Sequence, residues 1–263
     1  MTSYAQSKDG TRIAYDVYGA GSNKPPLVYI TGATCFRKFM PIVADAKVFA
    51  QEFTVYNYDR RGRGDSGDQQ PWLLEREVED IEAMIGAAGG KATLYGHSSG
   101  AVLALEAASR LVGKINKAVL YDTPYVHDAE EKAEYGQVAI KVRALLAQKK
   151  NAAAIKAFLA GIGTPKFVLF LLSLFPGWKT MKALAPTVAY DIALTEGFPP
   201  LSRFSGITIP VHVIAGQKSP VRVQAVAKQI AEAIPGSKLT IIPGQDHMVG
   251  AKVLLSELIK PIG

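Results

Sequence analysis

Short apolar runs of strand length alternate along this chain with segments of helical periodicity, and this alternation constrains the fold most strongly. The apolar runs lie at 27–31, 53–58, 92–95, 118–121, 211–215 and 239–242. The helical segments lie at 42–50, 74–87, 100–111, 221–233 and 252–259. Strands that are apolar throughout belong in a parallel sheet covered on both faces. The pattern therefore predicts an α/β fold with a doubly wound sheet.

The N-terminal segment departs from this pattern. Residues 11–18 alternate polar and apolar side chains and follow Asp9-Gly10, a dipeptide typical of hairpin turns. We therefore expect the sheet to begin with an antiparallel hairpin.

The interval 125–206 interrupts the alternation. It contains no convincing strand, only helical pattern broken by glycines and prolines. We interpret it as a helical insertion over the carboxyl ends of the strands, where open α/β sheets bind ligands. The alternative is a helical subdomain without a ligand role. The predicted division is a core of 1–124 and 207–263 with a helical insertion of 125–206.

Composition limits the cellular setting and the partners. The chain has 263 residues, is 48% hydrophobic and carries one cysteine, Cys35, which cannot form an intramolecular disulfide. Its N-terminus lacks the basic start and apolar run of a secretory signal, so we expect a cytoplasmic protein.

Two further partner classes are disfavoured. The longest apolar stretch, 167–175, falls short of the roughly 20 residues that a membrane-spanning helix needs. The net charge is +7, but the basic residues are scattered, and the densest group, Arg60, Arg61 and Arg63, lies in a glycine-rich turn. The sequence thus predicts neither an integral membrane segment nor a nucleic-acid partner, and it does not determine the oligomeric state.

The chemistry concentrates at Gly96-His97-Ser98-Ser99-Gly100. An apolar strand runs directly into this Gly-x-Ser-x-Gly motif, and a helix of small residues runs directly out of it. That context holds a serine in a strained turn with its hydroxyl projecting from the sheet. Side chains at Gly96 and Gly100 would collide with the neighbouring strand and helix. The alternative is a glycine-rich turn with an idle serine.

The sequence resembles the α/β-hydrolase family over essentially its whole length. The resemblance rests on four features, namely the motif at 96–100, Thr31-Gly32-Ala33 after an early strand, the segment 59–67 (DRRGRGDSG) after the next, and a late His247. It implies an eight-stranded, mostly parallel sheet with helices on both faces and a helical cap inserted after the sixth strand. The insertion at 125–206 corresponds to this cap.

A serine hydroxyl needs a base to become a nucleophile, and the chain has four histidines. His97 is beside Ser98 on a tight turn and is expected to point elsewhere. His212 lies within a strand as a core residue, and His127 lies at the entrance to the insertion. His247 follows the last strand, where the family keeps its base, so it is the predicted base. The alternative is a structural loop histidine.

The triad acid departs from the family pattern. The family usually has a Gly-x-x-Asp after the penultimate strand, whereas this chain has Gly216-Gln217-Lys218-Ser219. Asp122 ends the preceding strand on the same edge of the sheet, where some family members place the acid, so we predict Asp122. Alternatively, Asp122 caps the following turn, which leaves a Ser-His dyad or an inactive site.

Acyl transfer also needs donors for the tetrahedral oxyanion. One backbone N–H is expected from Ser99, at the start of the helix after the motif. By resemblance to the family's oxyanion loop, the other comes from Ala33, although that loop reads equally as a plain glycine turn.

Three other groups of residues call for an interpretation. The arginine-rich turn at 59–67 matches a family segment that we interpret as structural, with Asp59 and Asp65 satisfying backbone donors or arginines. Arg37 or Lys38 is a candidate for facing an anionic substrate group. The apolar stretch 167–175 either lines an acyl pocket or belongs to the core.

The predicted function is a serine hydrolase of carboxylic esters or related acyl bonds, with a small apolar substrate and without metal or organic cofactor. Ser98 attacks, His247 moves the proton, Asp122 orients His247, and Ala33 and Ser99 bind the oxyanion. The alternatives are carbon–carbon hydrolysis, lactone opening or cofactor-free perhydrolysis on the same fold, a non-catalytic small-molecule-binding protein, and a lipid-surface protein that uses 167–175 as its contact.

Overall fold

A computed structural model describes residues 2–21, 23–126, 128–174 and 177–262. Its strands form one eight-stranded sheet in the order β1-β2-β4-β3-β5-β6-β7-β8. The strands are β1 (Ser3–Gln6), β2 (Arg12–Tyr18), β3 (Pro26–Ile30), β4 (Thr54–Tyr58), β5 (Ala92–His97), β6 (Ile115–Tyr121), β7 (Val211–Gly216) and β8 (Lys238–Ile242). Strand β2 pairs antiparallel with both β1 and β4, and the remaining neighbours pair in parallel. The predicted mostly parallel sheet with its antiparallel N-terminal hairpin is confirmed.

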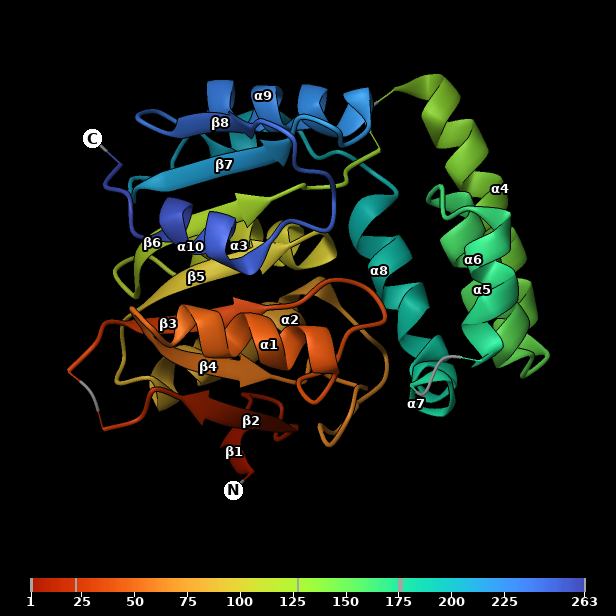
Figure 1. The fold of residues 1–263 in the computed structure, drawn as a ribbon, viewed down its shortest axis with the longest axis horizontal. Helices are drawn as coiled ribbons and strands as arrows, with labels where there is room; N and C mark the ends of the chain where they lie inside the picture. Colours follow the sequence, from red (N-terminus) through yellow and green to blue (C-terminus); the bar gives the residue numbers. More distant parts are fainter. Residues whose placement is uncertain (1, 22, 127, 175–176, 263) are drawn as a thin grey trace.

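The core helices cover both faces of the sheet (Figure 1). Helices α1 (Met40–Phe49) and α10 (Ala251–Leu258) pack on one face. Helices α2 (Leu74–Ala87), α3 (Ser99–Arg110) and α9 (Val221–Ala233) pack on the other. The bounds of α2 and α9 are those predicted from helical periodicity.

Alternating side chains of each central strand build the two halves of the core. In β3, Val28 and Ile30 join the apolar cluster under α2, α3 and α9, whereas Leu27 and Tyr29 join the cluster under α1 and α10. A strand buried on both faces must be apolar at every position. This explains why the sequence shows continuous apolar runs instead of alternation.

The segment between β6 and β7 is helical, and no strand occurs in the part of it that the structure describes. It contains α4 (Ala129–Ala147), α5 (Asn151–Gly161), α6 (Lys166–Leu171), η1 (Leu172–Leu174), α7 (Trp178–Ala183), η2 (Ala185–Thr187), α8 (Val188–Thr195) and η3 (Leu201–Phe204). We call this segment the cap. Its division from the core at 125 and 206 stays a prediction.

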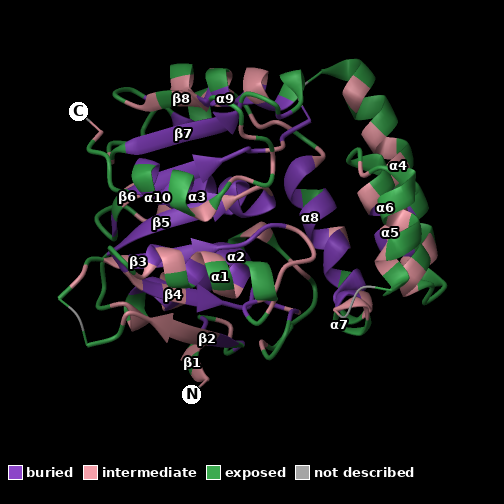
Figure 2. Ribbon diagram, viewed as in Figure 1, coloured by how far each residue is buried: buried purple, intermediate pink, exposed green. Residues whose placement is uncertain are grey.

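The cap has two layers of different burial. Helix α8 lies between the sheet and helices α4–α6 and is mostly buried, whereas α4 and α6 are largely exposed (Figures 1 and 2). Within the cap, apolar side chains of α4, α5, α7 and α8 form a cluster of their own. Among the described residues, no helix is long and apolar enough to cross a bilayer.

Candidate active site

Ser98 occupies a sharp turn between β5 and α3. Its backbone has φ 56° and ψ −127°, a conformation that side-chain-bearing residues adopt rarely. The Ser98 N–H donates to the carbonyl of Tyr121 at 2.9 Å, which ties the turn to β6. A side chain on Gly96 would meet the backbone of Gly100, and one on Gly100 would meet the backbone of Ile30. The collisions expected from the sequence are therefore confirmed, and they explain the two glycines.

Asp122 and His247 lie in hydrogen-bond contact at the carboxyl edge of the sheet. Asp122 follows β6, has φ 48° and is fully buried, and His247 follows β8. The Nδ1 atom of His247 is 3.0 Å from Oδ2 of Asp122. Because a carboxylate accepts, we assign the hydrogen to Nδ1, which leaves Nε2 as an acceptor. The imidazole is thus oriented by a carboxylate from a different strand.

Ser219 stands where the family usually has its acid, and its hydroxyl donates to Oδ2 of Asp122 at 2.6 Å. The backbone N–H of Gly216 donates to Oδ1 at 3.1 Å. These two contacts fix the plane of the Asp122 carboxylate from the end of β7. The serine at the position where the family usually has its acid therefore holds a carboxylate that follows the neighbouring strand, β6.

The other histidines take different places. Contrary to the expectation that it points elsewhere, His97 lines the same cavity as Ser98 and His247, and its ring centroid is 5.0 Å from that of His247. Burial, and then the charge of His247, lower the pKa of His97 to about 3. The hydroxyl of Tyr95 lies 3.0 Å from Nδ1 of His97.

His212 is fully buried in β7, where its Nε2 lies 2.8 Å from the Thr240 hydroxyl. This is the core position that the sequence predicts. His127 lies outside the described residues.

The predicted oxyanion donors lie beside Ser98. Ser99 is the first residue of α3, where a backbone N–H has no acceptor within its own helix. Ala33 and Ser99 both line the cavity that contains Ser98. A Cβ on Gly32 would come within 2.9 Å of the Ser98 Cβ, so the loop before Ala33 lies directly against the serine.

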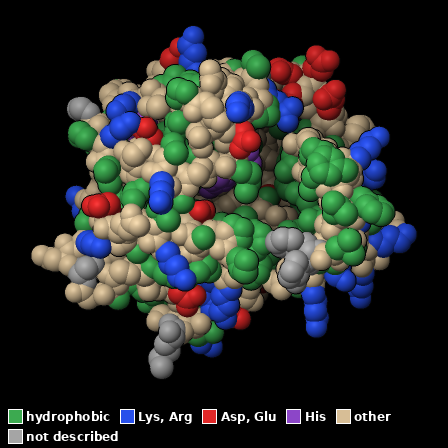
Figure 3. Space-filling view, viewed as in Figure 1, with side chains coloured by type: hydrophobic (Ala, Val, Ile, Leu, Met, Phe, Trp, Pro, Cys, Tyr) green, Lys and Arg blue, Asp and Glu red, His purple; other side chains and the backbone are tan. Residues whose placement is uncertain are grey.

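The cavity at this site has a volume of about 510 Å³ and lies between the core and the cap. Figure 3 shows a hollow with histidine at its base and apolar side chains along its cap side. Apolar side chains from both parts line it, among them Phe39, Ile42, Tyr125, Phe158 and Val168. A small apolar ligand fits such a lining.

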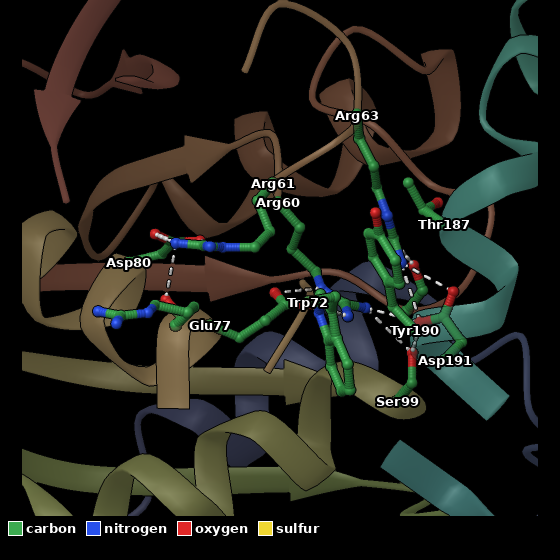
Figure 4. Close-up of polar contacts among 12 residues, drawn as sticks. Arg60, Arg61, Arg63, Trp72, Glu77, Asp80, Ser99, Thr187, Tyr190 and Asp191 are labelled. Carbon is green, nitrogen blue, oxygen red and sulfur yellow. Dashed lines mark hydrogen bonds and ion pairs between the residues drawn. The ribbon is translucent and has the colours of Figure 1, made fainter. Parts of the chain in front are cut away.

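A buried ionic cluster joins α8 of the cap to the turn beside Ser98 (Figure 4). Asp191 in α8 accepts from the hydroxyl of Ser99 at 2.7 Å and from Arg60 at 2.8 Å, and both of its oxygens accept from Arg63, at 2.9 and 2.8 Å. Burial alone would raise the pKa of Asp191, but Arg63 and Arg60 hold it below its usual value. Arg60 also forms a bidentate pair with Glu77 at 2.6 and 3.0 Å.

The same cluster reaches the loop that contains Gly32 and Ala33. Arg63 donates to the carbonyl of Gly32 at 2.6 Å, directly before Ala33. The arginine-rich turn therefore connects this loop, the start of α3 and the cap. Asp191 lies in the insertion, and no pattern in the sequence of a cap helix indicates which partners such an acidic residue meets.

The expectation for Arg37 and Lys38 was wrong. Arg37 is fully buried and donates to Asp16, Asp59 and Asp65 instead of facing a substrate. Lys38 also pairs with Asp65, at 2.8 Å. Asp59 accepts from the backbone N–H groups of Arg37 and Asp65, as the structural interpretation of this turn predicts.

No group of three or more His, Cys, Asp or Glu side chains within the described ranges is arranged to hold a metal ion.

Comparison with known proteins gives the family. Residues 19–251 match the model of the alpha/beta hydrolase family. The chain belongs to the alpha/beta hydrolase family. A solved alpha/beta hydrolase from Sphaerobacter thermophilus DSM 20745 is 35% identical, with a TM-score of 0.85 over 97% of this chain and 98% of that chain. No match was found among curated proteins.

Two other solved structures share the hydrolase fold at lower identity. An enol-lactonase from Burkholderia xenovorans LB400 is 18% identical, with a TM-score of 0.76 over 98% of each chain. The esterase RhEst1 from Rhodococcus sp. ECU1013 is 21% identical, with a TM-score of 0.67 over 98% of this chain and 96% of that chain. At these identities the likeness concerns the fold, which carries more than one chemistry.

Proposed function

We propose that this alpha/beta hydrolase is a serine hydrolase of carboxylic esters or related acyl bonds, acting through an acyl-enzyme. The contact of 3.0 Å between His247 Nδ1 and Asp122 Oδ2, in a site whose cavity Ser98 and His247 both line, carries this proposal. It supplies a base whose tautomer is set by a buried carboxylate, beside a serine on a strained turn.

The mechanism follows from the assigned tautomer. Ser98 Oγ attacks the carbonyl carbon while Nε2 of His247 accepts the hydroxyl proton, and Asp122 stabilises the resulting imidazolium. The backbone N–H groups of Ser99 and Ala33 bind the oxyanion, each contributing roughly 2.7 to 4 kcal/mol in the transition state. His247 then protonates the leaving group, and a water molecule deacylates Ser98 by the same path.

The apolar lining of the cavity favours an ester with an apolar acyl or alcohol part. Lactone opening uses the same attack on an ester carbonyl, with the leaving alcohol kept on the same molecule, and stays within the proposal. Perhydrolysis and carbon–carbon hydrolysis, which also occur on this fold, are distinguished from ester hydrolysis by the substrates that the enzyme turns over.

A fluorophosphonate probe tests the nucleophile, because only an activated serine attacks its phosphorus, displaces fluoride and becomes phosphonylated. We expect one label per chain on Ser98, located by peptide mass spectrometry, and loss of labelling in Ser98→Ala and His247→Ala. An unlabelled Ser98 in the folded protein supports the non-catalytic binding protein instead. A panel of p-nitrophenyl esters and lactones, with Ser98→Ala as blank, then gives the substrate class.

A further inference from the structure

One face of the cap is apolar and open to solvent. Helix α6 continues into η1, and Phe167, Phe170, Leu171 and Leu174 recur along it with the spacing of one helical face. These four side chains, which we call the cap stripe, are between 50% and 77% exposed. Apolar residues at helical spacing normally face a core, so a stripe facing outward marks an interaction surface.

The opposite side of the same helical segment packs against the cap and lines the cavity. Leu172 packs against the apolar cluster of the cap, and Val168 lines the cavity that contains Ser98 and His247. Ile162 and Pro165, just before the helix, also line that cavity. The cap stripe is therefore continuous with the cavity rim, and Figure 3 shows apolar side chains beside the hollow on the side where Figure 1 places α6.

The segment 135–190, which contains the cap stripe, carries charge of one sign. Residues 135–190 contain eight basic residues and no Asp or Glu, namely Lys141, Arg143, Lys149, Lys150, Lys156, Lys166, Lys179 and Lys182. Arg143 pairs with Glu196. Lys149, Lys150, Lys166 and Lys179 are exposed, and no carboxylate within the described residues forms an ion pair with them. A partner for this face must be both apolar and anionic.

A second copy of the chain does not meet this requirement. A two-fold interface would place the cap stripe against itself and bring two sets of unpaired lysines together. A bilayer that contains anionic lipid meets it, because acyl chains accept Phe and Leu while headgroup phosphates neutralise the flanking lysines.

We propose that the cap stripe docks the protein on an anionic lipid surface. Phe167, Phe170, Leu171 and Leu174 enter the boundary between headgroups and acyl chains, and the surrounding lysines bind phosphate. Because Ile162, Pro165 and Val168 connect the stripe to the cavity, the cavity rim then faces lipid. That an ester enters from the membrane rests on the proposed hydrolase function, whereas the docking does not.

Vesicle flotation with the Ser98→Ala protein tests docking without turnover. We expect the protein to float with vesicles of three parts phosphatidylcholine to one part phosphatidylglycerol, and to stay behind with pure phosphatidylcholine. The triple change F167S/F170S/L174S should lower the partition coefficient at least about tenfold. Each of Lys166→Ser and Lys179→Ser should lower it about fivefold, and high salt should weaken binding.

The matched control is V112S/I259S, which removes exposed apolar side chains outside the cap. It should float like the parent protein, with circular dichroism reporting the fold of every variant. Equal flotation of the triple variant and its parent would overturn the proposal. The proposal would also be overturned if sedimentation velocity showed a dimer that the triple change dissociates. The cap stripe would then be an interface between copies of the chain. A fluorophosphonate result of either kind leaves the flotation result interpretable, so the two proposals fail separately.

Discussion

Two buried aspartates lie on different sides of the Ser98 turn, and their surroundings differ. At the sheet edge, Asp122 accepts from Ser219, the Gly216 N–H and a half-exposed imidazole. At the base of the cap, Asp191 accepts from two buried arginines and from Ser99. A buried carboxylate that is paired with arginines holds segments of the fold together. A carboxylate that faces an imidazole instead stabilises the positive charge that the ring acquires only during a reaction. The same residue type at equal burial thus has two expected roles.

The largest expected effect is on activity at the sheet edge. Asp122→Asn keeps the shape of the side chain but removes the charge that stabilises the imidazolium. On the proposed function, kcat for a p-nitrophenyl ester should fall roughly 10⁴-fold with a small change in the free energy of unfolding. Ser219→Ala, which removes one hydrogen bond to the same oxygen, should cost at most about tenfold. A larger loss in Ser219→Ala than in Asp122→Asn would contradict the assignment of the acid.

The next effect is on stability at the base of the cap. Asp191→Asn leaves Arg63 without a carboxylate partner and Arg60 with Glu77 alone. Urea denaturation should show a loss of about 3–5 kcal/mol in the free energy of unfolding. Glu196→Gln, which breaks the exposed pair with Arg143, is the control and should change it by less than about 1 kcal/mol. Equal small changes in both variants would remove the distinction between the two aspartates.

The smallest expected effect is a dependence of the free energy of unfolding on pH. It distinguishes His97, in contact with His247, from Asp191 at the base of the cap. The pKa of His97 is about 3 in the folded state, below the roughly 6.5 of an unfolded histidine. Below pH 6.5 the unfolded chain therefore binds a proton that the folded chain does not, and stability falls as pH falls. Between pH 6.5 and 5 the loss attributable to His97 is about 2 kcal/mol.

The measurement is the difference in free energy of unfolding between the parent and His97→Asn across this range. The parent should lose stability relative to the variant as pH falls. The pKa of Asp191 lies below its usual value, so its contribution is lost only in stronger acid. The Asp191→Asn difference should consequently stay constant from pH 7 to 5, and a slope there would show that the two sides titrate together.

The parts of the site that the sequence predicted are local or near the ends of strands. The turn at Ser98 is recognisable because the Gly-x-Ser-x-Gly motif, the apolar strand before it and the helix of small residues after it are contiguous in the chain. Asp122 and His247 are predicted because both follow strands that end at one edge of the sheet, at places where the family resemblance puts the acid and the base. Their contact agrees with that reasoning, and their catalytic roles stay proposals.

The parts that the sequence did not reveal depend on partners far along the chain. Asp191 contacts Arg60 and Arg63, which are about half the sequence away. No sequence pattern in α8 indicates these contacts. Arg37 reads as a substrate-facing cation until three carboxylates are seen around it. The stretch 167–175 reads equally as core, pocket lining or surface contact, because only the packing of Leu172 and Val168 decides which side of α6 faces outward.

By itself the sequence determined the mostly parallel α/β sheet, the antiparallel start and the helical segment after β6, because these follow from apolar periodicity. The hydrolase family and the turn that holds Ser98 came from the resemblance of short motifs and from their place between a strand and a helix. The tertiary structure alone decided which charges meet, that Ser219 supports Asp122, and that α6 exposes Phe167 and Phe170. Ion pairing and burial depend on distances between segments remote in sequence, and those distances exist only once the chain has folded.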